Sequence, residues 1–211
     1  MKKKETFIAK YIEFELLEGR QPNSVYEFCK KFKSNEASFY EHFNSIDHLK
    51  KIILVNFVND TIDALDTDKD YESYSGREKL LAFFYTLFEN FKENRSYLIT
   101  KYKNTEAFKF KMEDWNLFFL QFNARIEAIL NEAKSVNEIA SRPYISSHYS
   151  KIFKVTLAYV FRVWVNDESK DFETTDAAIE KAVNSAFELL SAGPLDTLLD
   201  FGKFALKTKI S

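Results

Sequence analysis

Hydrophobic residues recur every three or four positions along most of the chain, the spacing typical of amphipathic helices. Capping boxes at Ser24–Glu27 and Ser75–Glu78 mark two helix starts, and Asn35 and Ser45 are good N-caps for two more. Gly19 is suited to end the first helix. The pattern predicts helices over residues 5–18, 25–32, 36–42, 46–65, 78–91, 96–110, 112–133, 148–166, 175–191 and 195–207.

The stretch 148–166 differs from the others because it is apolar nearly all round. A helix without a polar face must be covered on every side. We therefore expect it to contact its own core on one side and a second subunit on the other. Alanines in 175–191 allow close helix approach there. The residues we expect at this interface are Val160, Trp164, Val183 and Phe187.

Composition favours an all-α fold. The 211 residues include only four glycines and three prolines, which leaves little material for the tight turns of an all-β protein. Aromatic residues reach 17 %, with 22 phenylalanines. That content suits either a bulky interior or a cavity lined with rings, and composition alone does not separate the two.

Charge and cysteine content indicate which partner and which cellular compartment to expect. The net charge is −2, yet residues 1–51 carry ten basic against eight acidic residues. This slight surplus lies where a DNA-binding module would begin the chain. Cys29 is the sole cysteine, so no intrachain disulfide forms, and its apolar neighbours favour a small buried hydrophobe. No stretch is typical of a signal sequence or a membrane span, so we expect a cytoplasmic protein.

A series of caps and short helices near the N-terminus carries a family resemblance. A Ser24-capped helix is followed by a short helix that ends in Tyr40-Glu41-His42-Phe43, and then by a Ser45-capped helix containing Leu49. In this order and spacing, residues 5–60 resemble the helix-turn-helix of the tetracycline-repressor (TetR) family. The resemblance implies a three-helix DNA-binding domain over residues 1–46. It implies a larger helical bundle for ligand binding and dimerisation over residues 47–211, about nine helices in all.

The resemblance also implies the function and the residues that serve it. It implies a homodimeric, ligand-responsive transcriptional repressor that binds a near-palindromic double-stranded DNA operator. Hydroxyl, imidazole and cationic groups are suited to phosphate contacts. The expected DNA-binding residues are Ser24, Lys33, Asn35, Glu36, Ser38, Tyr40 and His42.

Two positions depart from the family pattern. Glu36 and Ile46 stand where relatives usually have lysine. Each lost cationic contact weakens DNA binding and flattens its salt dependence by roughly one counterion. Glu36 is also able to read the amino group of cytosine, although repulsion from phosphate is the simpler interpretation. Lys2–Lys4 are expected to compensate as a flexible arm.

The aromatic helices 78–91 and 113–130 have two interpretations. One is a bulky core, and the other is the apolar effector pocket that the family holds between these helices. A lipophilic effector, such as a fatty acyl or isoprenoid molecule, is expected there. The residues expected to line this pocket are Phe84, Phe88, Tyr102, Trp115, Phe119, Phe122 and Asn123.

No catalytic constellation emerges, so we do not expect an enzyme. Three histidines and one cysteine, without His-x-x-x-His spacing, argue against a metal site, and the four isolated glycines supply no phosphate loop. No cofactor is expected. An alternative to the regulator is a TetR-fold lipid-binding accessory protein that has lost DNA binding, similar to those of ubiquinone biosynthesis. Glu36, Ile46 and the acidic net charge favour that alternative.

Overall fold

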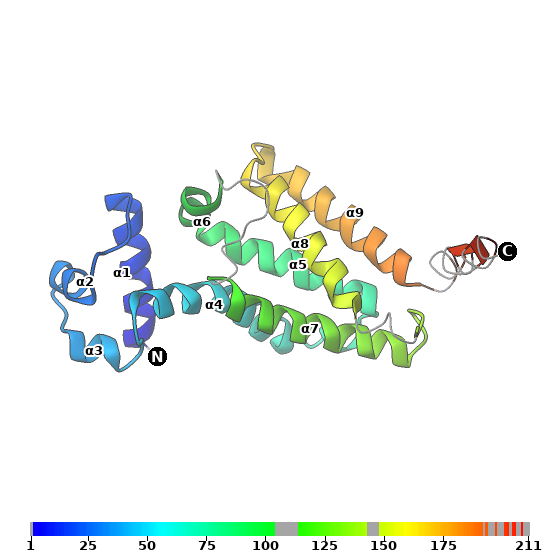
Figure 1. The fold of residues 1–211 in the computed structure, drawn as a ribbon, viewed down its shortest axis with the longest axis horizontal. Helices are drawn as coiled ribbons and strands as arrows, with labels where there is room; N and C mark the ends of the chain where they lie inside the picture. The colour runs from blue at the N-terminus through cyan, green and yellow to red at the C-terminus, as the bar shows by residue number, and fades with distance from the viewer. Residues whose placement is uncertain are drawn as a thin grey trace. The chain divides into compact units, whose positions relative to one another are not determined.

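The structure, a computed structural model, describes residues 2–103, 114–142 and 148–191, together with 193, 197, 201, 202, 204, 205 and 208. These residues form helices and connections with no strand, which confirms the predicted all-α class (Figure 1). The α-helices are α1 (Lys2–Glu18), α2 (Val25–Lys31), α3 (Glu36–Tyr40), α4 (Ile46–Thr67), α5 (Gly76–Glu93), α6 (Arg95–Tyr102), α7 (Asn116–Ser135), α8 (Tyr149–Val165) and α9 (Glu173–Leu190). Short 3₁₀ turns η1 (Tyr71–Ser73) and η3 (Lys170–Phe172) precede α5 and α9.

The predicted caps begin the helices as expected. The Ser24 hydroxyl accepts from the Glu27 amide at 3.1 Å, and Asn35 Oδ1 accepts from the Ser38 amide at 2.8 Å. At the start of α5 the box is reciprocal, because the Ser75 amide also donates to Glu78 Oε2 at 2.8 Å. Each cap satisfies an amide that the first turn of a helix leaves without a partner.

Two expectations about helix ends were wrong. Lys2–Lys4 form the first turn of α1 rather than a flexible arm. The helix predicted over 36–42 ends at Tyr40, where the His42 amide bonds to the Phe39 carbonyl three residues back and closes a tighter turn. The part of the predicted helix 96–110 beyond residue 103, and most of 195–207, lie outside the described residues.

The chain forms two compact units. The first comprises Met1–Thr61 and Leu87–Phe122, and the second comprises Ile62–Thr86 and Asn123–Ser211. These units are defined by how densely their residues contact one another. The boundary predicted between residues 46 and 47 instead separates a DNA-binding part from a ligand-binding part. That boundary stays a prediction.

In the first unit, α1 packs against α6 around a buried ion pair. Glu15, which is largely buried on α1, accepts a hydrogen bond from the Tyr11 hydroxyl. Its Oε2 lies 2.7 Å from Lys101 Nζ on α6. The same ammonium lies 4.9 Å from the centre of the Tyr97 ring. Burial lowers the pKa of Lys101, against the opposing effect of the Glu15 carboxylate.

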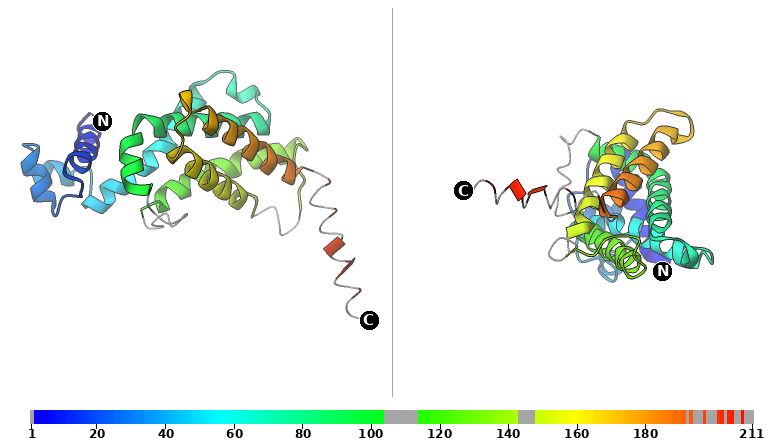
Figure 2. Two further views of the ribbon diagram at one scale, coloured as in Figure 1. Left: turned by 90° about the horizontal axis from the view of Figure 1, so that it is seen from above. Right: turned by 90° about the vertical axis from the view of Figure 1, so that its right-hand side faces the viewer.

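In the second unit, α8 and α9 lie side by side along their length (Figures 1 and 2). Asp167, just after α8, accepts from the amide of Thr175 at 2.8 Å and from its hydroxyl at 2.5 Å. At the other end of α9, the buried guanidinium of Arg142 donates to the carbonyls of Leu190 and Ser191. Both ends of α9 are therefore fixed by charged side chains that satisfy its terminal backbone groups.

Candidate nucleic-acid interface

The α1–α3 unit is held by a cluster of aromatic rings. Phe7 on α1, Phe28 on α2 and Phe39 on α3 are almost fully buried, and Phe43 closes the cluster. The Phe7 and Phe39 rings meet edge to face at 5.6 Å, and the Phe28 and Phe39 rings do so at 6.0 Å. Edge-to-face pairs of this kind are favourable and directional. They fix α2 and α3 relative to α1 and place Phe39 and Phe43 in the core of this part of the chain.

The turn between α2 and α3 is a complete Schellman motif. The Ser34 amide bonds to the Cys29 carbonyl at 2.9 Å, and the Lys33 amide bonds to the Lys30 carbonyl at 3.3 Å. This motif needs a left-handed residue, and Lys33 supplies it with φ of 51°. Asn35 then caps α3. The result is a helix-turn-helix whose turn projects the Lys33 side chain into solvent.

Most of the predicted DNA-binding residues lie at or near the surface of this motif. Ser24, Lys33 and Asn35 are exposed, although the oxygens of Ser24 and Asn35 accept the cap hydrogen bonds. Glu36 is the first residue of α3, and Ser38, two residues further, is half-buried. Tyr40 ends α3 with 51 % of its side chain exposed. The motif therefore presents a hydroxyl, an amide, a cation and a phenol to solvent.

His42 is placed less favourably for a DNA contact. Its ring lies 6.3 Å from both the Phe7 and the Phe43 rings, and its Nε2 is buried without a hydrogen-bond partner among the described residues. A phosphate contact through Nε2 would require the ring to turn out of the core. The role assigned to His42 stays a prediction.

Ion pairs engage several of the cations near the helix-turn-helix. Lys31 pairs with Glu18, and Lys50 pairs with Asp47 at 2.7 Å. Arg20 holds Glu27 at 2.5 Å, and this bond, with one from the Asn23 amide, lowers the pKa of Glu27 to about 2. Among the described parts of the first unit, Lys30, Lys33 and Lys51 form no such pair.

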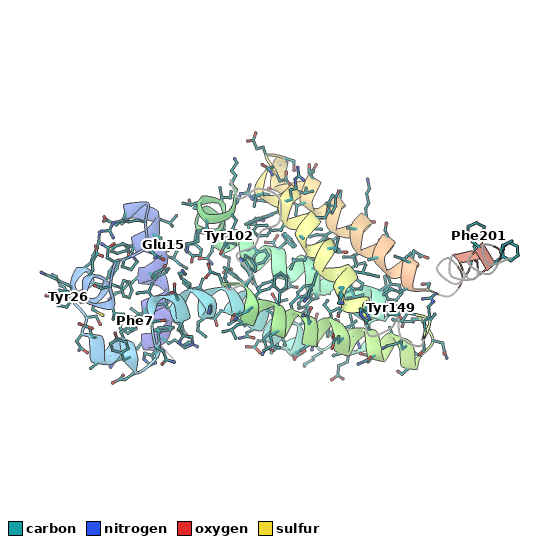
Figure 3. All side chains as sticks on the ribbon, viewed as in Figure 1. Phe7, Glu15, Tyr26, Tyr102, Tyr149 and Phe201 are labelled. Carbon is teal, nitrogen blue, oxygen red and sulfur yellow. The ribbon has the colours of Figure 1, made fainter. Side chains whose placement is uncertain are left out.

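Sequence reasoning missed Tyr26. Its side chain, labelled in Figure 3, is 59 % exposed on α2. Lys30 Nζ lies 5.7 Å from the centre of its ring. The two residues are four positions apart and both lie outside the apolar stripe of α2. On a predicted helix this spacing makes them surface neighbours, so the pair could have been found from the sequence. A phenol beside a cation is well suited to a phosphate group.

Cys29 lies beneath this surface. Burial, together with the nearby Glu36 carboxylate, raises the pKa of its thiol above the ordinary value. A buried thiol with a raised pKa is poorly reactive. This agrees with its predicted role as a small core residue.

The residues predicted for the effector pocket fall into both units. Phe84 and Asn123 belong to the second, and the other five belong to the first. In the first unit the rings are in contact, with Trp115 at 5.3 Å from Tyr102 and at 4.8 Å from Phe118. Asn123 Oδ1 is buried without a hydrogen-bond partner among the described residues. The pocket stays a prediction, and the described rings form packed aromatic clusters.

The four residues predicted for the dimer interface lie inside the single chain. Val160, Trp164, Val183 and Phe187 are all almost fully buried. The outer stripe of α8 is different and exposes Val155 and Tyr159. The 148–166 stretch is therefore apolar on two sides, with one side covered by its own chain.

Comparison with known proteins identifies the family. The model of the tetracyclin repressor-like C-terminal domain matches residues 79–205, more than half of the chain. The chain belongs to the tetracyclin repressor-like family. The matched residues follow the helix-turn-helix in the chain. The match therefore supports the TetR resemblance from a second, separate part of the sequence. No match is found among curated proteins. No helix in the described part of this TetR-like protein is long and apolar enough to cross a membrane.

Proposed function

We propose that this TetR-like protein is a ligand-responsive transcriptional repressor that binds DNA as a homodimer through α2 and α3. The observation that carries the proposal is the capped helix-turn-helix on a rigid aromatic core, with Tyr26, Lys30, Lys33 and Tyr40 on its surface. Lysines and tyrosines at such positions supply phosphate contacts, and a short second helix supplies base contacts in the major groove.

Glu36 is proposed to set the character of this DNA binding. As the first residue of α3 it brings a carboxylate to the end of the helix that enters the groove. Repulsion from phosphates lowers affinity for every sequence, while acceptance of a hydrogen bond from cytosine favours particular ones. A protein with this residue binds weakly to random DNA and depends on a matching operator.

The test is selection from genomic fragments followed by an electrophoretic shift at low salt. A regulator shifts a subset of fragments, and the selected sites share a near-palindrome with half-sites about 34–36 Å apart along the helix axis. Absence of any shift at micromolar dimer would overturn the proposal. If Glu36→Lys combined with Ile46→Lys created binding that the natural chain lacked, the accessory-protein alternative would replace it.

A dimer is supported by the outer stripe of α8. Val155 is 70 % exposed and Tyr159 follows one turn later, with Lys151 and Arg162 at the two ends of the stripe. The exposed face of α9 carries acidic residues, among them Glu180. Two copies related by a two-fold axis bury the apolar stripe and bring opposite charges together.

The effector is proposed to be a lipophilic molecule with one hydrogen-bond donor. The aromatic content of α5 and α7 supports an apolar body, and the buried Asn123 Oδ1, which accepts no hydrogen bond from a described residue, supports the donor. Native mass spectrometry of gently purified protein is expected to show a copurifying small molecule whose addition releases the operator. A copurifying lipid with no effect on DNA binding would favour the accessory-protein alternative.

A further inference from the structure

The first helix has a second apolar face that the described residues of its own unit leave uncovered. Phe7, Tyr11 and Phe14 point into the core. Ala9, Ile12, Leu16 and Leu17 form another stripe, at the spacing by which one helix packs on another. Leu17 is 70 % exposed and Leu16 is 42 % exposed. Adjacent exposed leucines on a helix that already has a buried face indicate a binding surface.

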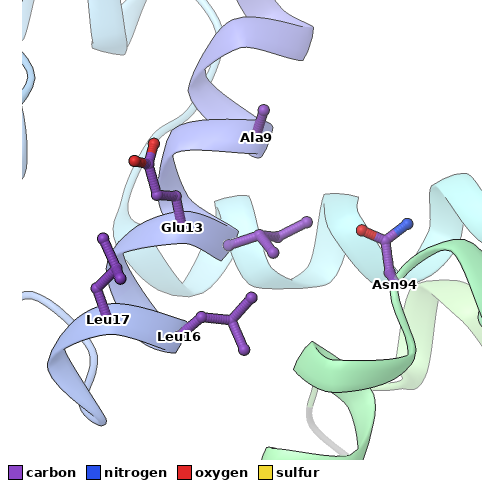
Figure 4. Close-up of a pocket in the computed structure, with 6 residues that line it drawn as sticks. Ala9, Glu13, Leu16, Leu17 and Asn94 are labelled. Carbon is purple, nitrogen blue, oxygen red and sulfur yellow. The ribbon is translucent and has the colours of Figure 1, made fainter.

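This stripe forms one wall of an open groove. The groove has a volume of about 360 Å³ and is lined by Ala9, Ile12, Glu13, Leu16, Leu17 and Asn94 (Figure 4). Leu16 lies on the side of α1 that faces Asn94, at the junction between α5 and α6. From Ala9 to Leu17 the helix rises about 12 Å, so the wall is roughly two turns long. A partner helix of three turns spans it.

The rim of the groove is acidic. Glu13 lines it, Glu5 lies two turns before Glu13 on the same face of α1, and Glu93 precedes Asn94. None of these three carboxylates forms an ion pair with a described side chain. The nearby Lys92 is held by Glu89 at 3.3 Å. The groove therefore combines an apolar floor with one lining carboxylate, that of Glu13, which forms no ion pair with a described side chain.

This charge decides between the possible occupants. DNA is excluded by like charge. A second copy docked groove to groove would bring two Glu13 carboxylates together, which is also repulsive. We propose that the groove binds a basic amphipathic helix of a partner protein, with leucine-type side chains on Leu16 and Leu17 and lysine or arginine side chains at the acidic rim. The surface is distinct from the helix-turn-helix and does not depend on its function.

The test uses defined peptides with the full chain. A fluorescent 14-residue peptide carries leucines at helical spacing and lysines elsewhere. A second peptide has glutamates in place of the lysines, and a third has the first composition in an alternating order. Anisotropy titration is expected to give an affinity for the first peptide about tenfold above that for either of the others.

Matched variants locate the binding. Leu17→Ala and Glu13→Gln are each expected to weaken binding of the lysine peptide roughly fivefold, and the effect of Glu13→Gln should shrink in high salt. The controls Leu120→Ala and Glu72→Gln remove comparably exposed side chains outside the groove. They should leave the affinity for the lysine peptide unchanged. Circular dichroism and the thermal midpoint check that every variant is folded.

Three outcomes would overturn the proposal. The first is no preference for the helical lysine peptide over the other two. The second is equal weakening by Leu17→Ala and Leu120→Ala, which would indicate non-specific adsorption. The third is sedimentation showing that Leu16→Glu with Leu17→Glu dissociates an oligomer of the natural chain, which would assign the groove to a second copy instead.

Discussion

Lys33 has two roles that oppose each other at a single residue. Its φ of 51° is the left-handed conformation that the Schellman turn requires, and a side chain with a Cβ is strained there by about 1 kcal/mol. A glycine would adopt this conformation without strain. The exposed ammonium is meanwhile a proposed phosphate contact. Stability and DNA binding should therefore change in opposite directions when this residue is replaced.

Lys33→Gly is expected to raise the free energy of unfolding by about 0.5–1 kcal/mol and to weaken DNA binding severalfold. Urea unfolding and a binding titration measure the two effects. Lys33→Asn is the matched control, since it also removes the charge but gains less stability. If Lys33→Gly instead lowered the free energy of unfolding, strain in the left-handed turn would not be what reduces stability at this residue.

Asp167 gives a pH-dependent contribution to stability. Burial opposes its ionisation, but hydrogen bonds from Ser169 and Thr175 outweigh burial and hold the pKa of this carboxyl below its ordinary value. A lowered pKa in the folded state stabilises the protein above the unfolded-state pKa, which is about 3.9. The contribution is lost as pH falls through that value towards the folded-state pKa.

Asp167→Asn is accordingly expected to lower the free energy of unfolding by about 2 kcal/mol at pH 7, because a charged acceptor of several hydrogen bonds becomes neutral. The difference from the natural chain should shrink below about pH 4. Denaturant unfolding at several pH values measures it. A difference that stayed constant between pH 7 and pH 3 would refute the assignment.

At the level of single elements, helix starts were predictable because their caps are local. Ser24, Asn35 and Ser75 act through residues three positions away, so the sequence contains both partners. The burial of His42 Nε2, by contrast, accompanies the packing of its ring near Phe7 on α1. Such contacts join residues far apart in the chain, and periodicity carries no information about them.

The contact between α1 and α6 provides a test at this scale. Removing only Lys101 leaves the Glu15 carboxylate buried without its cation. Lys101→Met is expected to cost about 3 kcal/mol of stability, and adding Glu15→Gln should recover a large part of the loss. Urea unfolding of both single variants and the double variant measures the coupling. Simple additivity of the two single effects would show that the ion pair does not join these helices.

For the whole molecule, the outer stripe of α8 predicts the state of association. Val155→Glu with Tyr159→Glu places two charges on the proposed interface and is expected to give a monomer that no longer binds an operator. Sedimentation measures the mass. Leu120→Glu, at a comparably exposed position on α7, should leave a dimer intact. A dimer that survives the α8 substitutions would place the interface elsewhere.

The class of fold and the helix-turn-helix were predictable from sequence, whereas the residues of the interfaces were only partly so. Val160 and Trp164 belong to the same apolar helix as Val155 and Tyr159, and only packing decides which side its own chain covers. Tyr26 was missed because aromatic residues are frequent in this chain, although its pairing with Lys30 four positions later, outside the apolar stripe of α2, would have indicated it. Hydrophobic periodicity predicts that a residue is buried, but it does not distinguish burial within the same chain from burial against a partner.

If α2 and α3 bind DNA through their surface cations, the affinity for DNA depends on salt concentration in proportion to the number of those contacts. The affinity of the natural chain for a selected operator is measured between low and moderate salt, beside Lys30→Ala, Lys33→Ala and the control Lys69→Ala, which removes an exposed cation outside α2 and α3. We predict that Lys30→Ala and Lys33→Ala each weaken binding and reduce the salt slope by about one counterion per half-site. The control variant is expected to bind like the natural chain. No binding by the natural chain, or equal slopes for all four proteins, would show that Lys30 and Lys33 are not phosphate contacts.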